Sequence, residues 1–187
     1  MATGFKLTRK GITANLEPGE RDLLRKLFSD VQALLEPETA ADADPLAALV
    51  GIDSSAREPE DPALLRLLPN GTAGSEEEAL EFRRFTERSL RESKQAALRA
   101  AALQLETGSI RLDAEQAQLF ARALNDVRLV LGDRLDLSND EDAERLQEIT
   151  DPSKAQDIDG YLALVYNFVT WLQETLMQAL LDSLPRP

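Results

Sequence analysis

The sequence predicts a mainly α-helical protein: a helical bundle of three long helices plus short helices, with a small N-terminal β-hairpin. Three observations support this prediction. Leucine-rich segments repeat their apolar residues at the spacing of an amphipathic helix. The long segments open with residues that cap helices. Only residues 5–16 alternate apolar and polar side chains in the manner of paired strands. With 187 residues, we expect a single helical domain over 1–187.

The N-terminal segment "FKLTRKGITANL" (5–16) predicts the hairpin, with Gly11 in the turn and the apolar positions on one face. A helix is predicted over 17–36, where Pro18 suits the first turn and leucines recur at helical spacing. Residues 36–75 read as a loop-rich insertion with two short helices, "DPLAALVG" (44–51) and "DPALLRLLPNG" (61–71).

A long helix is predicted over 76–106. Ser75 and Glu78 form a capping box at its start, and Thr107-Gly108 ends it. Its helical spacing predicts a buried stripe made of Ala79, Phe82, Phe85, Thr86, Ser89, Ala96, Ala97, Ala100 and Leu103.

The second half of the chain continues the pattern. "SIRLD" (109–113) is predicted as a short extended link that pairs with the hairpin. A helix capped by Asp113 runs through Leu135, an acidic loop covers 136–156, and the last helix covers 157–183.

Arg128 stands out in the helix that ends at Leu135, since it falls at the edge of the apolar stripe. We expect it to be largely buried, and a buried guanidinium needs a carboxylate or carbonyl partner. Glu87 and Glu92 on the preceding long helix are the candidate partners. The preferred interpretation is a structural buried ion pair that fixes helix register, and the alternative is an anion-binding or partner-binding site.

Two surfaces are candidates for contact with a partner. Arg84, Arg88 and Arg91 cluster on the long helix, and they form either a docking strip for an acidic partner or a solvated face with helical ion pairs. Trp171 lies off the main apolar face of the last helix. That helix is either a core helix or, in part, a dimer or partner surface, where aromatic residues are enriched.

Composition excludes several chemistries. The chain has no cysteine and no histidine, which rules out thiol chemistry and removes the usual general base and commonest metal ligand. No catalytic residue, metal or cofactor site is predicted. The acidic loop does not match the pattern of a calcium-binding loop, because it lacks the glycine and the final glutamate that such a loop needs. A net charge of −13 disfavours nucleic acid, and "YLALVYNFVTWL" (161–172) is too short to span a membrane. A cytoplasmic protein is expected.

Several stretches together resemble the actinobacterial AosR family. They are "FKLTRKGITANLEPGERDLLRKL" (5–27), "DPALLRLLP" (61–69), "EFRRFTERSLRESK" (81–94), "RLDAEQAQLFARALNDVRLVLGDRL" (111–135) and "WLQETLMQAL" (171–180). The resemblance implies an oxidative-stress transcriptional regulator that acts with other proteins. It also implies sensing through a cysteine pair, which this cysteine-free chain has no residue to perform.

The sequence therefore favours a non-catalytic interaction or regulatory protein whose partner is another protein, for which the resemblance suggests the transcription machinery. A homodimer is a further possibility for its surfaces. Direct DNA binding and an unrecognised enzyme are the alternatives from other classes.

Overall fold

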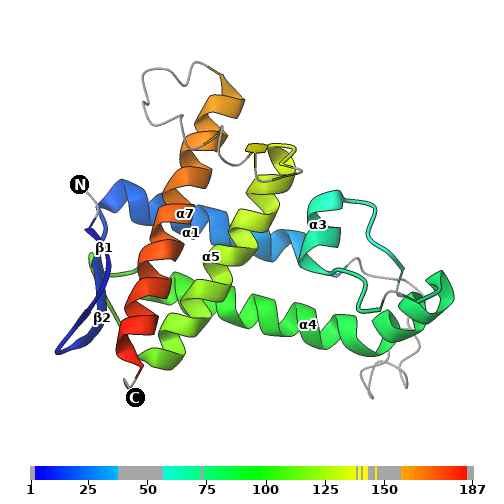
Figure 1. The fold of residues 1–187 in the computed structure, drawn as a ribbon, viewed down its shortest axis with the longest axis horizontal. Helices are drawn as coiled ribbons and strands as arrows, with labels where there is room; N and C mark the ends of the chain where they lie inside the picture. Colours follow the sequence, from blue (N-terminus) through cyan, green and yellow to red (C-terminus); the bar gives the residue numbers. More distant parts are fainter. Residues whose placement is uncertain are drawn as a thin grey trace.

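Several long helices and a small antiparallel sheet make up the structure, a computed structural model (Figure 1). It describes residues 3–37, 57–72, 74–137, 139, 141, 142, 146 and 157–184. The mainly helical fold is thus confirmed. The short helix predicted over 44–51 and most of the acidic loop over 136–156 lie outside the described residues.

The sheet has three strands in the order β1 (Thr3–Thr8), β2 (Gly11–Asn15) and β3 (Ser109–Leu112). Both neighbouring pairs are antiparallel, so the predicted hairpin and its pairing with the 109–113 segment are confirmed. Gly11 has a φ of 103°, a conformation that glycine adopts without strain. The inner face of the sheet buries Phe5, Ile12, Ala14, Ile110 and Leu112.

The sheet lies at one end of the molecule (Figure 1), and the structure describes five helices: α1 (Pro18–Leu34), α3 (Pro62–Leu67), α4 (Glu76–Gln104), α5 (Ala114–Arg134) and α7 (Ile158–Ser183). Helix α5 is central, because it packs against each of the other four and also contacts the sheet. The predicted capping boxes at the starts of α4 and α5 are both present.

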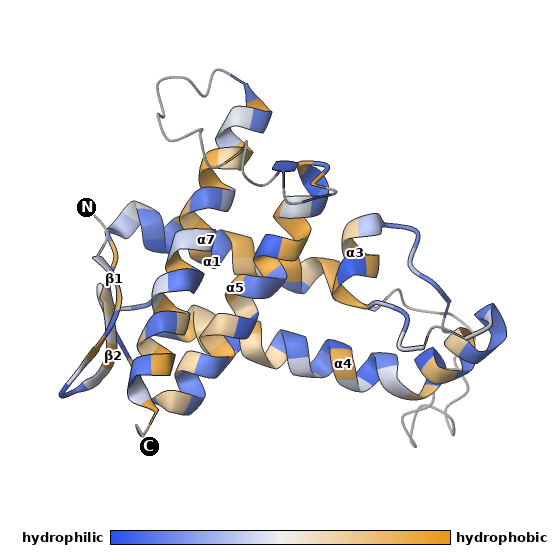
Figure 2. Ribbon diagram, viewed as in Figure 1, coloured by the Kyte–Doolittle hydropathy of each residue, from blue (hydrophilic) through white to orange (hydrophobic). Residues whose placement is uncertain are grey.

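The hydrophobic core is centred on Phe120 of α5, which is fully buried. Its ring meets the ring of Phe5 from β1 at 5.4 Å and that of Phe28 from α1 at 5.8 Å, both edge to face. Helix α7 covers the sheet edge and ties the two ends of the chain together, since the Phe5 amide donates to Thr175 Oγ1 at 3.1 Å. In Figure 2, α7 is more hydrophobic along its length than α4.

Helix α3 is held at its first turn by Asp61. One carboxylate oxygen caps the helix by accepting from the Ala63 amide, and the other accepts from Arg134 of α5 at 2.7 Å. This hydrogen bond from Arg134 lowers the pKa of Asp61 below its ordinary value. Among the described helices, none is long and apolar enough to cross a membrane.

The predicted buried stripe of α4 is wrong for most of its members. Ala79 and Ala97 are buried, but the side chains of Phe82, Phe85 and Leu103 are 47%, 57% and 63% exposed. The helix is rotated so that its inner face is made by Arg83, Glu87, Ala97, Leu98, Ala101 and Leu105. Hydrophobic periodicity predicted the opposite orientation because two members of the inner face, Arg83 and Glu87, are charged, and their burial depends on the hydrogen bonds and ion pairs that they form there.

Candidate functional site

The three arginines of the predicted docking strip on α4, Arg84, Arg88 and Arg91, do not lie on one surface. Arg84 and Arg88 are exposed, and Arg88 pairs with Glu92 on the same face at 3.1 Å. Arg91 instead turns inward, where its guanidinium donates to Glu87 at 2.7 Å and to the Leu35 carbonyl at the end of α1 at 3.1 Å. Arg91 is therefore a structural residue, and the exposed Arg84 and Arg88 do not form one docking strip with it.

A buried ionic cluster joins Arg83, Glu87 and Arg91 on the inner face of α4. Arg83 donates to Glu87 Oε2 at 2.5 Å, while Arg91 uses Oε1 of the same carboxylate. Arg83 also donates to the buried Leu68 carbonyl at 2.9 Å and to Asn70 at 2.8 Å. Both oxygens of the Glu87 carboxylate therefore accept a hydrogen bond from an arginine. Through Arg83, the cluster also links α4 to the segment that follows α3.

A second buried pair links α4 to α5. Lys94 Nζ lies 2.6 Å from Oδ1 of Asp126, whose side chain is 3% exposed. Burial raises the pKa of the Asp126 carboxyl above its ordinary value, and the hydrogen bond from Lys94 opposes that rise. This pair explains why an acid stands inside the leucine-rich stretch of α5: it meets the neighbouring helix and not water.

Arg128 does not take the partners predicted for it. It is half-buried and donates to Gln173 Oε1 at 2.9 Å and to the Tyr166 hydroxyl at 3.4 Å, both on α7. Its guanidinium also lies 5.6 Å from the centre of the Tyr166 ring. The predicted ion pair with Glu87 or Glu92 is therefore wrong, because Arg128 faces α7 while both glutamates lie on α4. Glu87 is in a buried ionic cluster, but with other arginines.

The outer face of the sheet carries a group of cations that sequence reasoning did not single out. Strand register places Lys6 and Arg111 on either side of Thr13, so the two cations flank it across three strands. Arg9 and Lys10 extend the group into the turn, and all four cations are exposed. We call Lys6, Arg9, Lys10 and Arg111 the basic sheet face.

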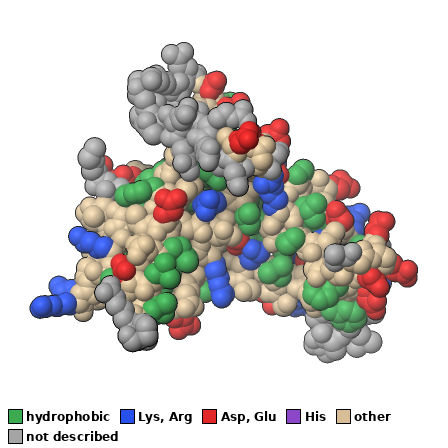
Figure 3. All heavy atoms as spheres, in the orientation of Figure 1, with side chains coloured by type: hydrophobic (Ala, Val, Ile, Leu, Met, Phe, Trp, Pro, Cys, Tyr) green, Lys and Arg blue, Asp and Glu red, His purple; other side chains and the backbone are tan. Residues whose placement is uncertain are grey.

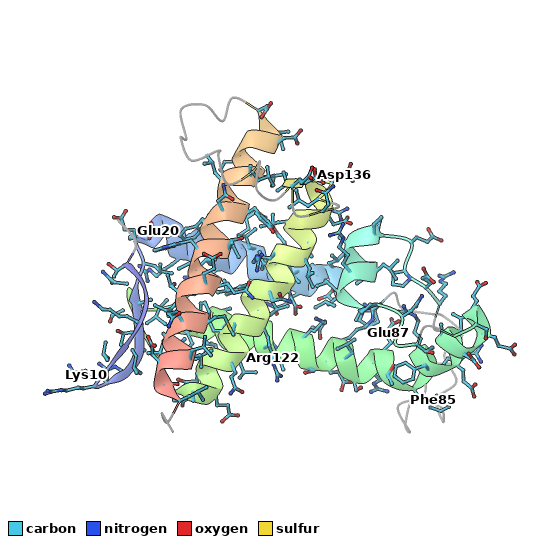
Figure 4. The ribbon with its side chains drawn as sticks, in the orientation of Figure 1. Lys10, Glu20, Phe85, Glu87, Arg122 and Asp136 are labelled. Atoms are coloured by element: carbon cyan, nitrogen blue, oxygen red, sulfur yellow. The ribbon has the colours of Figure 1, made fainter. Side chains whose placement is uncertain are left out.

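This basic sheet face stands out from the rest of the chain by its charge. The first 16 residues and the 109–112 strand hold no acid at all, although the chain as a whole has a net charge of −13. The four cations form no ion pair with any described residue. Lys and Arg side chains project at the hairpin end of the molecule in Figure 3, and Lys10 extends into solvent in Figure 4.

A signal for this surface was present in the sequence. The alternation that put Phe5 on the inner face of the hairpin also puts Lys6 on its outer face. Arg111 belongs to the same surface only through the pairing of β2 with β3, which joins residues about 100 positions apart. The cluster therefore becomes visible only when the third strand is placed.

Trp171 borders the sheet from α7. Its indole packs against the backbone of Gly4, where an added Cβ would come within 3.0 Å of indole Cζ2. The ring also lies near that of Phe168, with ring centres 6.2 Å apart. The indole remains 37% exposed, so this predicted contact residue helps to hold β1 and still reaches the surface.

No group of three or more Asp and Glu side chains in the described residues is placed to hold a metal ion. No curated protein and no solved structure matches the chain. A family model matches residues 2–180, which is nearly the whole sequence and includes both the sheet and α7. The chain therefore belongs to the family described as a domain of unknown function, DUF2017.

Proposed function

We propose that this protein is a non-catalytic interaction module that docks on an acidic partner protein through the basic sheet face. The observation that carries the proposal is the concentration of four exposed cations, which form no ion pair with any residue that the structure describes, on strands without an acid in a strongly acidic chain. Such a surface attracts a partner of opposite charge and orients it, because the rest of the molecule repels the same partner.

The role we propose for this docking is regulation of transcription or of the stress response through protein contacts. Its support is the resemblance to the AosR family, which implies a partner from the transcription machinery; that this partner is acidic is inferred from the basic sheet face alone. The chain has no cysteine, so any signal reaches it through the partner or through its abundance, and not through oxidation of its own thiols.

The sheet gives this surface a rigid support. Lys6 and Arg111 lie two strand spacings apart, or about 10 Å, and the buried Phe5 and Ile110 on the reverse face fix the strands to the core. The nearby indole of Trp171 supplies an apolar contact at the rim. A charged centre on a rigid sheet with an aromatic neighbour suits recognition of a protein surface.

A pull-down from the native cytoplasm with two matched variants tests the proposal. Lys6→Glu/Arg111→Glu reverses two charges on the basic sheet face. Arg84→Glu/Arg88→Glu makes the same charge change on α4, where both side chains are also exposed. We expect the sheet variant to lose a partner that the α4 variant retains.

The partner identified in this way is then titrated in purified form. The chain has a single tryptophan beside the sheet, so docking there should shift its fluorescence emission. We expect affinity to fall steeply with salt, since the contact is between opposite charges. Retention of the same partner by the sheet variant, or equal loss in both variants, would rule out the sheet as the docking surface.

Direct nucleic-acid binding is the second candidate, and the same four cations favour it. The outer face of the described sheet offers hydroxyl and amide groups but no aromatic side chain on which a base would stack. The acidic remainder of the chain also repels phosphates, which makes this candidate weaker. A low-salt mobility shift that depends on Lys6 and Arg111 would replace the protein partner with nucleic acid.

A further inference from the structure

The exposed side of α4 carries two large aromatic side chains beside a row of small residues, and one edge of the Phe82 ring packs over the Gly71 backbone. Phe82 and Phe85 are about half exposed, and they are followed at helical spacing by the small residues Ser89, Ser93 and Ala96, which are also exposed. We call these five residues the α4 stripe. In Figure 4, Phe85 and Glu87 project from opposite sides of α4, which separates this stripe from the buried ionic cluster.

From its shape and charge, we propose that the α4 stripe pairs with the same stripe of a second copy of this chain. The two helices run antiparallel, with the two-fold axis at Ser89. This surface is separate from the basic sheet face, so the inference does not depend on the proposed function.

The order of large and small side chains supports the pairing. A two-fold axis at Ser89 places each residue opposite the one equally far on the other side of position 89. Phe82 then faces Ala96 of the second copy, and Phe85 faces Ser93 of the second copy. Each phenyl ring thus lies over a small residue, which lets the helices approach closely and interdigitate.

The charges beside the stripe are complementary to themselves in the same register. Glu81 comes within about one turn of Arg99 of the second copy. Arg88, which pairs with Glu92 of its own chain at 3.1 Å, comes similarly close to Glu92 of the second copy. The two-fold axis repeats each pair, so four attractive contacts flank the rings. Glu81 and Arg99 form no ion pair with any described residue of their own chain, which leaves both available.

The opposite orientation is disfavoured by the same residues. In a parallel pair, identical positions meet across the axis, so phenyl rings would stack on phenyl rings and Ser89, Ser93 and Ala96 would leave a gap. An overall charge of −13 on each copy also opposes association, and the four attractive pairs offset part of that repulsion.

The expected dimer is weak. One pair of helices buries less than the roughly 1,200 Å² of a stable interface. We therefore expect a dissociation constant of about 10–100 μM, and a monomer at concentrations well below it. Sedimentation velocity over this range should show the weight-average mass rising toward twice that of one chain.

The absence of cysteine makes disulfide trapping a sharp test of the register. In Ser89→Cys the two sulfur atoms face each other across the axis, at a separation that a disulfide spans. In Arg99→Cys, which changes the same helix away from the axis, they do not. Mild oxidation should convert the first variant to covalent dimer and leave the second largely monomeric.

Two further variants separate loss of pairing from loss of folding. Phe85→Lys changes an exposed residue, so its circular dichroism should match the wild type while dimerisation weakens at least tenfold. Arg99→Glu should weaken pairing, and Glu81→Arg/Arg99→Glu should restore it. A chain that stays monomeric at high concentration, or equal trapping of both cysteine variants, would overturn the proposal. Trapping of Arg99→Cys alone would overturn the antiparallel register.

Discussion

Removing the central carboxylate of the buried ionic cluster should be the most damaging single change to α4. Glu87 accepts from Arg83 on one oxygen and from Arg91 on the other, at distances of 2.5 and 2.7 Å. In Glu87→Ala, Arg83 keeps its bonds to the Leu68 carbonyl and to Asn70, but loses its only carboxylate. A guanidinium whose side chain is 4% exposed is then left without a counter-charge.

The size of the effect follows from that burial. Breaking a buried pair by removing one partner costs about 3–5 kcal/mol of unfolding free energy. For a chain of this length, each kcal/mol lowers the melting temperature by about 2–4 °C, so a fall of roughly 6–20 °C is expected. The matched control is Arg88→Ala on the same helix, whose pair with Glu92 is more than half exposed and should change stability by less than about 0.5 kcal/mol.

Urea unfolding followed by circular dichroism measures both variants, with the slope of the transition checked for constancy. A double-mutant cycle with Arg83→Met and Glu87→Leu then isolates the pair. The double variant should be more stable than the sum of the single losses predicts, with a coupling of about 2 kcal/mol. The buried-cluster reasoning is refuted if Glu87→Ala and Arg88→Ala unfold at the same urea concentration.

Three further predictions concern pH and backbone geometry. Lys94→Met should lower the free energy of unfolding by roughly 3 kcal/mol near neutral pH, because it leaves the buried Asp126 carboxylate unpaired. Urea unfolding at mildly acidic pH should show a smaller decrease, since the raised pKa of Asp126 lets its carboxylate take up a proton as pH falls. Asp61→Asn keeps a helix cap but loses the charge. The free energy of unfolding of the wild type should therefore be about 0.5 kcal/mol higher than that of the variant at neutral pH. This difference should disappear as pH falls through the lowered pKa of Asp61, which unfolding experiments at a series of acidic pH values would measure. Gly11→Ala should cost about 1–3 kcal/mol in thermal unfolding, because a Cβ at a φ of 103° would lie 2.8 Å from a β3 carbonyl, whereas Gly19→Ala meets nothing within 4 Å and should leave stability unchanged or slightly higher.

Local signals predicted the secondary structure well. Ser75 and Asp113 were identified as helix caps from their neighbours alone, and both accept the expected backbone hydrogen bonds. The alternation around Gly11 placed the hairpin correctly and also most of its inner face, although Leu7, which the same alternation puts on that face, is 44% exposed. These features depend on residues within a few positions of one another, which is why a single sequence reveals them.

The orientation of α4 was beyond the same reasoning. Hydrophobic periodicity placed Phe82 and Phe85 inside, and the structure places Arg83 and Glu87 there. Charged residues can be buried in a core when they pair with each other. Hydrophobic periodicity counts such residues as exposed, and it does not show that Lys94 of α4 pairs with Asp126 on another helix. The candidate site was missed for a similar reason, because the basic sheet face gathers residues from strands far apart in the chain.

The hydrogen bond from the Phe5 amide to Thr175 has a consequence for the order of synthesis. The first strand leaves the ribosome early, but the helix that covers its edge comes 170 residues later. At about 5–20 residues per second, the nascent strand waits roughly 8–35 s with its outer edge open. A stalled or truncated product lacking this last helix would therefore present an unprotected edge, a feature by which cellular quality control can distinguish incomplete chains from finished ones.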